Sequence, residues 1–183
     1  MQIVQDIKSL YLTQGSTRYG ENVTQLEHAL QTAQLAINDG YNTEFIMACF
    51  LHDIGHLQYA EGLAKKNIDG EHEELGANYL SDFFSARVTE PIRLHVAAKR
   101  YLCATRPDYH ASLSKASQHS LKLQGGAFNE KAVYEFEQRP LFREAIQLRL
   151  YDDQGKITGL NVIEFDEILK QLECLVKQTY SLI

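Results

Sequence analysis

Three residues that could bind a metal ion stand close together in this sequence. His52 and Asp53 are adjacent, and His56 follows one helical turn later. Imidazole nitrogens and carboxylate oxygens bind divalent cations, and two histidines at this spacing on a helix face the same point. Asp53 is rotated away from His52 on an ideal helix, so it reaches the same ion only at a helix end or kink. The Asp53-Ile54-Gly55 step supplies such a break. Because the stretch around these residues is apolar, the group predicts a metal site.

Three more histidines and a second carboxylate extend this candidate site. His28, His72 and His95 each fall on the apolar face of a separate expected helix, and Asp152 lies near the end of another. A lone buried histidine is more often a hydrogen-bonded core residue than a ligand, and a lone Asp152 is more often a helix-end residue. The shared pattern favours a joint role as ligands. The other two histidines lie in a polar region and are expected at the surface: His110 and His119.

Two cationic residues accompany the metal-ligand candidates. Lys99 lies one turn after His95, and Arg149 precedes Asp152 by three residues, so each shares a face with its neighbour. An Arg fork and a Lys ammonium together suit a dianionic tetrahedral group. The alternatives are a solvated helix residue for Lys99 and a surface ion pair with Glu144 or Asp153 for Arg149.

The helical spacing of apolar residues predicts an all-α protein with one domain spanning residues 1–183. Thr24 followed by Glu27 is a capping box that opens a helix containing His28. We expect a loop over 61–70 and helix starts at Thr89, with Pro91 in the first turn, and at Pro140. The remaining helices are expected over about 4–14, 43–54, 71–83, 114–123 and 162–180.

Composition excludes several classes of partner. The net charge of −6 argues against binding to nucleic acid or to a membrane surface, which needs a basic face. No stretch has the length and apolarity of a membrane span, and the N-terminus lacks the features of a signal peptide. Three cysteines are far apart, and Cys49 and Cys103 are interpreted as buried free thiols. We therefore expect a cytoplasmic location.

The order His28, His52-Asp53, Asp152 resembles the H…HD…D signature of HD-domain proteins, most of which are metal-dependent phosphohydrolases. Longer motifs are similar to those of the PhnZ-type oxygenases, distant relatives of myo-inositol oxygenase, over about residues 18–156. The motifs are QLEHAL (25–30), LHDIGH (51–56), HEELGANYL (72–80), HVAAKRYL (95–102), LSKAS (113–117) and LQGGAF (123–128).

This resemblance implies two iron ions. One would be held by His28, His52, Asp53 and Asp152, and the other by Asp53 as a bridge together with His72 and His95. Nitrogen and oxygen ligands without thiolate suit iron but also manganese or zinc, so spacing alone does not name the metal. His56 is implied to act near the substrate hydroxyl without being a firm ligand.

The resemblance also implies a set of substrate-binding residues. Lys99 and Arg149 would neutralise a phosphonate, with hydrogen bonds from Ser117 and Gln124; from the residues alone, both of these are equally turn or cap residues. Glu21 matches a glutamate that recognises the substrate amine. The family's gating tyrosine matches Arg18, and Tyr19 takes its place only if the loop is one residue shorter. This departure is also compatible with a substrate that carries a trimethylammonium group, which cation–π contact with an aromatic cage would favour.

The function implied is a mixed-valent di-iron dioxygenase that uses O2 to cleave a C–P bond. The substrate would be a 2-amino- or 2-trimethylammonio-1-hydroxyethylphosphonate, and the products glycine or glycine betaine and phosphate. Two alternatives stay open at this point. One is an HD phosphohydrolase acting on a nucleotide or another phosphate ester, in which a metal-bound hydroxide attacks phosphorus. The other is a non-catalytic, metal-stabilised helical module.

Overall fold

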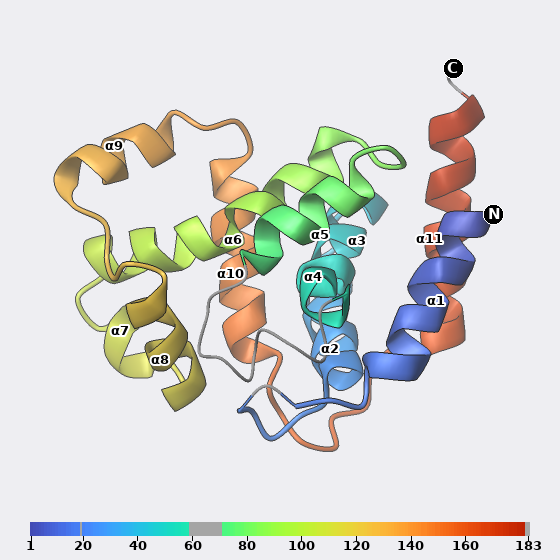
Figure 1. Cartoon of the computed structure of the whole chain (residues 1–183), viewed down its shortest axis with the longest axis horizontal. Coiled ribbons are helices and arrows are strands. Elements are labelled where there is room, and N and C mark those ends of the chain that lie inside the picture. The colour runs from blue at the N-terminus through green and yellow to red at the C-terminus, as the bar shows by residue number, and fades with distance from the viewer. Residues whose placement is uncertain (19, 59–70, 182–183) are drawn as a thin grey trace.

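The structure is a computed structural model that describes residues 1–18, 20–58 and 71–181, and this part of the chain contains helices and no strand (Figure 1). The prediction of an all-α protein is confirmed. The helices are α1 (Gln2–Gln14), α2 (Gln25–Asn38), α3 (Thr43–Leu51), α4 (Ile54–Gln58), α5 (His72–Leu80), α6 (Ala86–Thr105), α7 (Tyr109–Ser112), α8 (Lys115–Leu123), α9 (Glu130–Glu137), α10 (Phe142–Gln154) and α11 (Phe165–Ser181).

The longest helix, α6, crosses the molecule and packs against α10, α5 and α3, while α2 lies against α3 and α10 (Figure 1). The first and last helices, α1 and α11, lie side by side at one end. The shorter helices α7, α8 and α9 gather at the opposite end, around the far half of α6. The central helices α2, α3, α6 and α10 therefore form the frame from which the site residues project.

The core surrounds α3. Every residue of this helix from Phe45 to Leu51 is buried, and its neighbours in the largest apolar cluster come from α1, α2, α5, α10 and α11. Burying one large apolar side chain, such as leucine or phenylalanine, contributes about 1.5–3 kcal/mol to folding stability relative to leaving it exposed. The end of α3 is consequently a rigid platform for the residues that follow it, His52 and Asp53.

The start of α2 confirms the predicted capping box. The backbone N–H of Glu27 donates to Oγ1 of Thr24 at 3.2 Å, and the backbone N–H of Thr24 donates to Oε2 of Glu27 at 2.7 Å. These bonds satisfy two backbone donors that a helix start leaves without partners. They fix the first turn of α2, which is the turn that carries His28.

The predicted start of α6 at Thr89 is wrong. The helix begins at Ala86, and Ser85 is its N-cap, with Oγ accepting from the backbone N–H of Arg87. Pro91 therefore lies inside the helix. A proline removes one backbone hydrogen bond there. Burial of Val88 and the residues after the proline favours the longer helix over a start at Thr89.

Other differences lie in the C-terminal half. α10 begins at Phe142 rather than at Pro140, because Leu141 adopts a left-handed conformation with φ of 60°. The short helices α7 and α9 were not predicted. The sequence does contain residues that favour α9, because Asn129 caps its first turn and Phe136 is buried on its inner face. The loop predicted over 61–70 lies outside the described residues.

Within the described part of the chain, no helix combines the length and apolarity that crossing a membrane requires.

A close contact between glycines sets the position of α5 against α4. A Cβ placed on Gly55 would lie 2.0 Å from the carbonyl oxygen of His72, and one placed on Gly76 would lie 3.2 Å from the backbone nitrogen of Gly55. The two backbones therefore touch where any side chain would separate them. This contact brings the first turn of α5 beside α4, and the ring of His72 stacks on that of His56 with centroids 3.9 Å apart.

We predict that Gly55→Ala lowers the free energy of unfolding by about 2–3 kcal/mol, because the new methyl group meets backbone that must shift. Gly40→Ala is the matched control: Gly40 has a φ of 73° and no atom within 4 Å of the added Cβ, so only conformational strain of about 1 kcal/mol is expected. Urea denaturation measures both. Equal losses in the two variants would contradict the close packing of α4 on α5.

Candidate active site

The break between α3 and α4 presents two ligand-type residues to the centre of the molecule. α3 ends at Leu51, His52 is its C-cap residue, and α4 begins at Ile54. Asp53 thus lies between two helices, free of the helical rotation that would turn it away from His52. The kink predicted at this step is confirmed.

Four histidines meet at this point as two facing pairs. Nε2 of His28, from α2, lies 3.2 Å from Nε2 of His52. Nε2 of His72, at the start of α5, lies 3.1 Å from Nε2 of His95, from α6. All four side chains are buried. The tertiary structure therefore collects the histidines that the sequence placed on separate helices.

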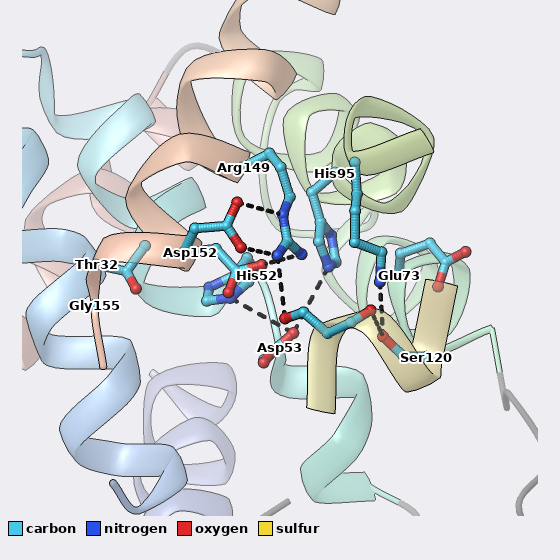
Figure 2. A network of polar contacts seen from close by, with 12 residues as sticks. Thr32, His52, Asp53, Glu73, His95, Ser120, Arg149, Asp152 and Gly155 are labelled. Atoms are coloured by element: carbon cyan, nitrogen blue, oxygen red, sulfur yellow. Dashed lines mark hydrogen bonds and ion pairs between the residues drawn. The ribbon is translucent and has the colours of Figure 1, made fainter. Parts of the chain in front are cut away.

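The Asp53 carboxylate lies between the two pairs. Its Oδ1 is 3.5 Å from Nε2 of His52, 3.5 Å from Nε2 of His72 and 3.7 Å from Nε2 of His95. Its Oδ2 is 3.7 Å from Nε2 of His28. Figure 2 shows Asp53 below His52 and His95, with its carboxylate directed at the space between them. One carboxylate is thus placed to serve both pairs.

The opposite ring nitrogens assign the tautomers of three of these histidines. Nδ1 of His28 is 2.7 Å from the carbonyl oxygen of Gly155, and Nδ1 of His95 is 2.7 Å from that of Ile92. Nδ1 of His52 is 2.9 Å from the carbonyl oxygen of Cys49. A carbonyl only accepts, so each Nδ1 carries a proton, and the neutral rings of His52 and His95 carry their lone pair at Nε2. Burial lowers the pKa of His28, but the Asp152 carboxylate 3.3 Å from its Nε2, together with Asp53, outweighs burial and raises that pKa.

Lone pairs of neighbouring nitrogens that point at one another repel unless a cation lies between them. Carbonyl partners on the far nitrogen are also the usual second support of a metal-binding histidine. The donor set therefore fits metal binding.

Asp152 adds a carboxylate to the first pair. Its Oδ1 lies 3.3 Å from Nε2 of His28, and its Oδ2 lies 2.6 Å from Nη1 of Arg149. Figure 2 shows the side chains of Arg149 and Asp152, both from α10, next to each other and joined by dashed lines. His28, His52 and Asp152 can offer ligand atoms that all lie within 4.8 Å of one another, as can Asp53, His56 and His72.

Both carboxylates stay ionised despite burial. Burial raises the pKa of Asp53, but the charges of His52, His56 and His72 outweigh it and hold that pKa well below its usual range. Burial likewise raises the pKa of Asp152, and Arg149, Lys156 and His28 together outweigh it. Burial, reinforced by neighbouring histidines, lowers the pKa of His52 and, more strongly, that of His95, which favours neutral imidazoles that can bind metal.

Lys99 and Arg149, the two predicted cations, are both buried, which rules out a solvated position for Lys99. Nζ of Lys99 donates to Oγ of Ser120 at 2.8 Å, and Nη2 of Arg149 reaches Oγ of Ser117 at 3.5 Å. Arg149 does pair with Asp153, as its alternative interpretation proposed, but inside the protein rather than on its surface.

Arg149 is held by two residues that the sequence did not single out. Its Nε donates to the Tyr109 hydroxyl at 3.1 Å and to Oδ2 of Asp153 at 3.2 Å, and the Tyr109 hydroxyl donates to Asp153. Burial raises the pKa of Tyr109 strongly, so the hydroxyl keeps its proton. The guanidinium is therefore fixed in place before any ligand binds.

Lys156 is a site residue that sequence reasoning missed. Its Nζ lies 3.5 Å from Oδ1 of Asp152, 3.2 Å from Oγ of Ser117 and 3.1 Å from Oε1 of Glu21. Its position four residues after Asp152 is the same spacing that singled out Lys99 after His95, so the signal was present.

The structure describes two of the three remaining predicted substrate-binding residues, Glu21 and Gln124. Glu21 lies beside Lys156, and Gln124 is the C-cap residue of α8 with a buried Oε1 that has no hydrogen-bond partner among the described residues. Tyr19 lies outside the described residues, and the side chain of Arg18 is exposed. The histidines expected at the surface are both exposed: His110 and His119.

Buried nitrogen and oxygen donors in two adjoining groups, on a helical frame and beside buried cations, define a candidate metal-binding protein. The HD domain family matches residues 26–152. The chain is 47% identical over 165 residues to the hydroxymethylphosphonate dioxygenase of Gimesia maris, covering 88% of this chain and 82% of that protein.

It is also 45% identical over 166 residues to the [1-hydroxy-2-(trimethylamino)ethyl]phosphonate dioxygenase (glycine-betaine-forming) of Leisingera caerulea, covering 89% of this chain and 85% of that protein. The chain belongs to the HD-domain family and, within it, to the phosphonate dioxygenases. The resemblance inferred from its motifs is confirmed.

We predict that a divalent metal stabilises the metal-free protein, because the folded state alone presents the converging Nε2 atoms. At 100 times the dissociation constant the gain is about 2.7 kcal/mol per site, roughly 5–10 °C in melting temperature for a chain of this length. His95→Gln should lose a large part of the shift measured with Mn²⁺ or anaerobic Fe²⁺. The matched control His119→Gln, at an exposed histidine, should keep all of it; equal shifts in the two variants would refute the assigned site.

Proposed function

We propose that this protein is a di-iron dioxygenase that uses O2 to cleave the C–P bond of a 1-hydroxyphosphonate, releasing phosphate and a carboxylic acid. The observation that carries the proposal is the placement of Asp53 between two facing histidine pairs, beside buried Lys99 and Arg149. Membership of the phosphonate dioxygenases supports the same reaction.

The proposed ligand sets follow the two groups of donors. His28, His52, Asp53 and Asp152 would hold one iron, and Asp53, His72 and His95 the other, with Asp53 shared. A carboxylate, unlike an imidazole, has two oxygens with which to serve two cations; Oδ1 of Asp53 lies near His52, His72 and His95, and its Oδ2 lies near His28. Bound iron would supply the redox chemistry with O2 and a Lewis acid for substrate oxygens.

The residues of the chain would bind and orient the phosphonate. Arg149 offers a fixed fork, since Asp153 and Tyr109 already hold it, and Ser117 lies within reach of both Arg149 and Lys156. A preorganised charge in a buried site stabilises a dianion without the cost of rearranging solvent. Gln124 directs a buried oxygen that is free to accept a hydrogen bond.

Two further residues would act at the substrate hydroxyl and the phosphonate. His56 stacks on His72 and belongs to the group of donors around Asp53, so it is placed to take the proton of a hydroxyl bound there. Lys99, held by Ser120 on the same buried face as His95, would neutralise phosphonate charge.

The partners we propose are therefore a small organophosphonate and O2, with no nucleic acid or membrane. The three free cysteines support the cytoplasmic location predicted above. The HD phosphohydrolase alternative would use the same ligands but would need no O2, so oxygen dependence separates the two.

We predict that the anaerobically purified protein binds two irons and releases phosphate from hydroxymethylphosphonate or [1-hydroxy-2-(trimethylamino)ethyl]phosphonate only when O2 is admitted. Metal analysis and a phosphate assay with and without O2 measure this. Phosphate released equally in the absence of O2, or from a phosphate ester instead, would replace this proposal with hydrolysis.

We predict that Arg149→Lys raises the KM for the phosphonate by about 10- to 100-fold, because the ammonium keeps the charge but loses the two-pronged geometry. Arg143→Lys on the exposed face of the same helix is the matched control and should leave KM unchanged. A KM that is unaltered in Arg149→Lys would remove Arg149 from the phosphonate site.

A further inference from the structure

The carboxylate expected to recognise a substrate amine already has a cationic partner within the chain. Oε1 of Glu21 lies 3.1 Å from Nζ of Lys156, and it accepts a hydrogen bond of 2.6 Å from Oγ of Ser114. Both are interactions that a substrate ammonium would otherwise make with this oxygen. The side chains of Glu21 and Lys156 are only 22% and 16% exposed, so solvent screens this pair weakly.

Lys156 is held at this place from three sides. Its ammonium also lies 3.5 Å from Oδ1 of Asp152 and donates to Oγ of Ser117 at 3.2 Å. The carboxylates of Glu21 and Asp152 and the Ser117 hydroxyl thus all present oxygen atoms to this ammonium. Lys156 therefore lies between the carboxylate of Glu21 and that of Asp152, one of the residues proposed to hold iron.

A second cation beside Glu21 would be strongly disfavoured. A substrate ammonium within contact distance of Oε1 would lie a few ångströms from Nζ of Lys156, in a partly buried region where like charges repel more strongly than in water. The Lys156 ammonium favours a small dianionic substrate instead.

We propose that Lys156 determines substrate specificity by occupying the position of a substrate cation, so that this enzyme acts on 1-hydroxyphosphonates that lack a cationic group, such as hydroxymethylphosphonate. This inference rests on the proposed function. It differs from the expectation that Glu21 binds a substrate amine.

The reaction on this substrate balances without an added reductant. Hydroxymethylphosphonate and O2 give formate and phosphate: the C–P bond and one C–H bond break, and carbon and phosphorus each gain an oxygen. The substrate is oxidised and O2 is reduced by four electrons, with both oxygen atoms in the products.

The test compares two substrates on the iron-loaded full chain. The wild-type protein should have a kcat/KM for hydroxymethylphosphonate at least about tenfold above that for [1-hydroxy-2-(trimethylamino)ethyl]phosphonate. In Lys156→Met, the value for hydroxymethylphosphonate should fall and that for the cationic substrate should rise, shifting the ratio about tenfold or more. Most of this change should lie in KM, which should rise for hydroxymethylphosphonate and fall for the cationic substrate.

Two other variants control this result. Lys156→Arg keeps the charge and should keep the wild-type preference, and Lys170→Met, at an exposed lysine of α11, should change neither value. Wild-type preference for the cationic substrate would overturn the inference and leave the oxygenase proposal standing. A parallel fall for both substrates in Lys156→Met would reduce Lys156 to a structural role. Failure of the wild-type protein to use any phosphonate with O2 would instead sink the proposed function.

Discussion

The site depends on four imidazole rings whose Nε2 atoms are turned towards one another around a single carboxylate. Imidazoles do not gather in this way by themselves, because each loses its hydration on burial. The fold must therefore impose it. It does so by ending α3 immediately before His52 and Asp53, by packing α4 against α5 through two glycines, and by burying α3 on all sides. The proposed metal ions would bind where these nitrogens meet.

Around the proposed metal ligands, each buried cation is paired with an acidic or hydroxyl side chain. Asp152 contacts His28 on one side and Arg149 and Lys156 on the other, so the ligand carboxylate also anchors the two cations. Arg149 is in turn fixed by Asp153 and Tyr109, while Ser120 holds Lys99. Buried cations of this kind are stable only when paired. The pairing leaves the binding groups in their working positions before substrate arrives, which is the condition for effective electrostatic catalysis.

The proposed role of the Glu21–Lys156 pair would let one internal ion pair set specificity without any change in the metal site. The relatives of this chain are named for phosphonates with and without a trimethylamino group, and they share nearly half of its residues. A difference between such substrates is a difference of one charge, so the proposed role of Lys156 needs only one side chain at the amine position. In this proposal the metal ligands supply the chemistry, and residues beyond them select the substrate.

The sequence by itself determined the residue types and the helical pattern. His28, His52-Asp53 and Asp152, with His72 and His95, were recognisable because their spacing and apolar surroundings persist in the one-dimensional pattern, and the capping box at Thr24 fixed a helix start. The tertiary structure decided which side chains meet. Lys156, Ser114 and Glu21 lie far apart in the chain or on irregular segments, and their contact depends on how α8 and the end of α10 pack. The start of α6 was likewise decided by burial, since Pro91 is accommodated inside a helix whose neighbouring residues are packed. Local periodicity records which face is apolar, whereas partners across the fold are set by packing that no short stretch of sequence contains.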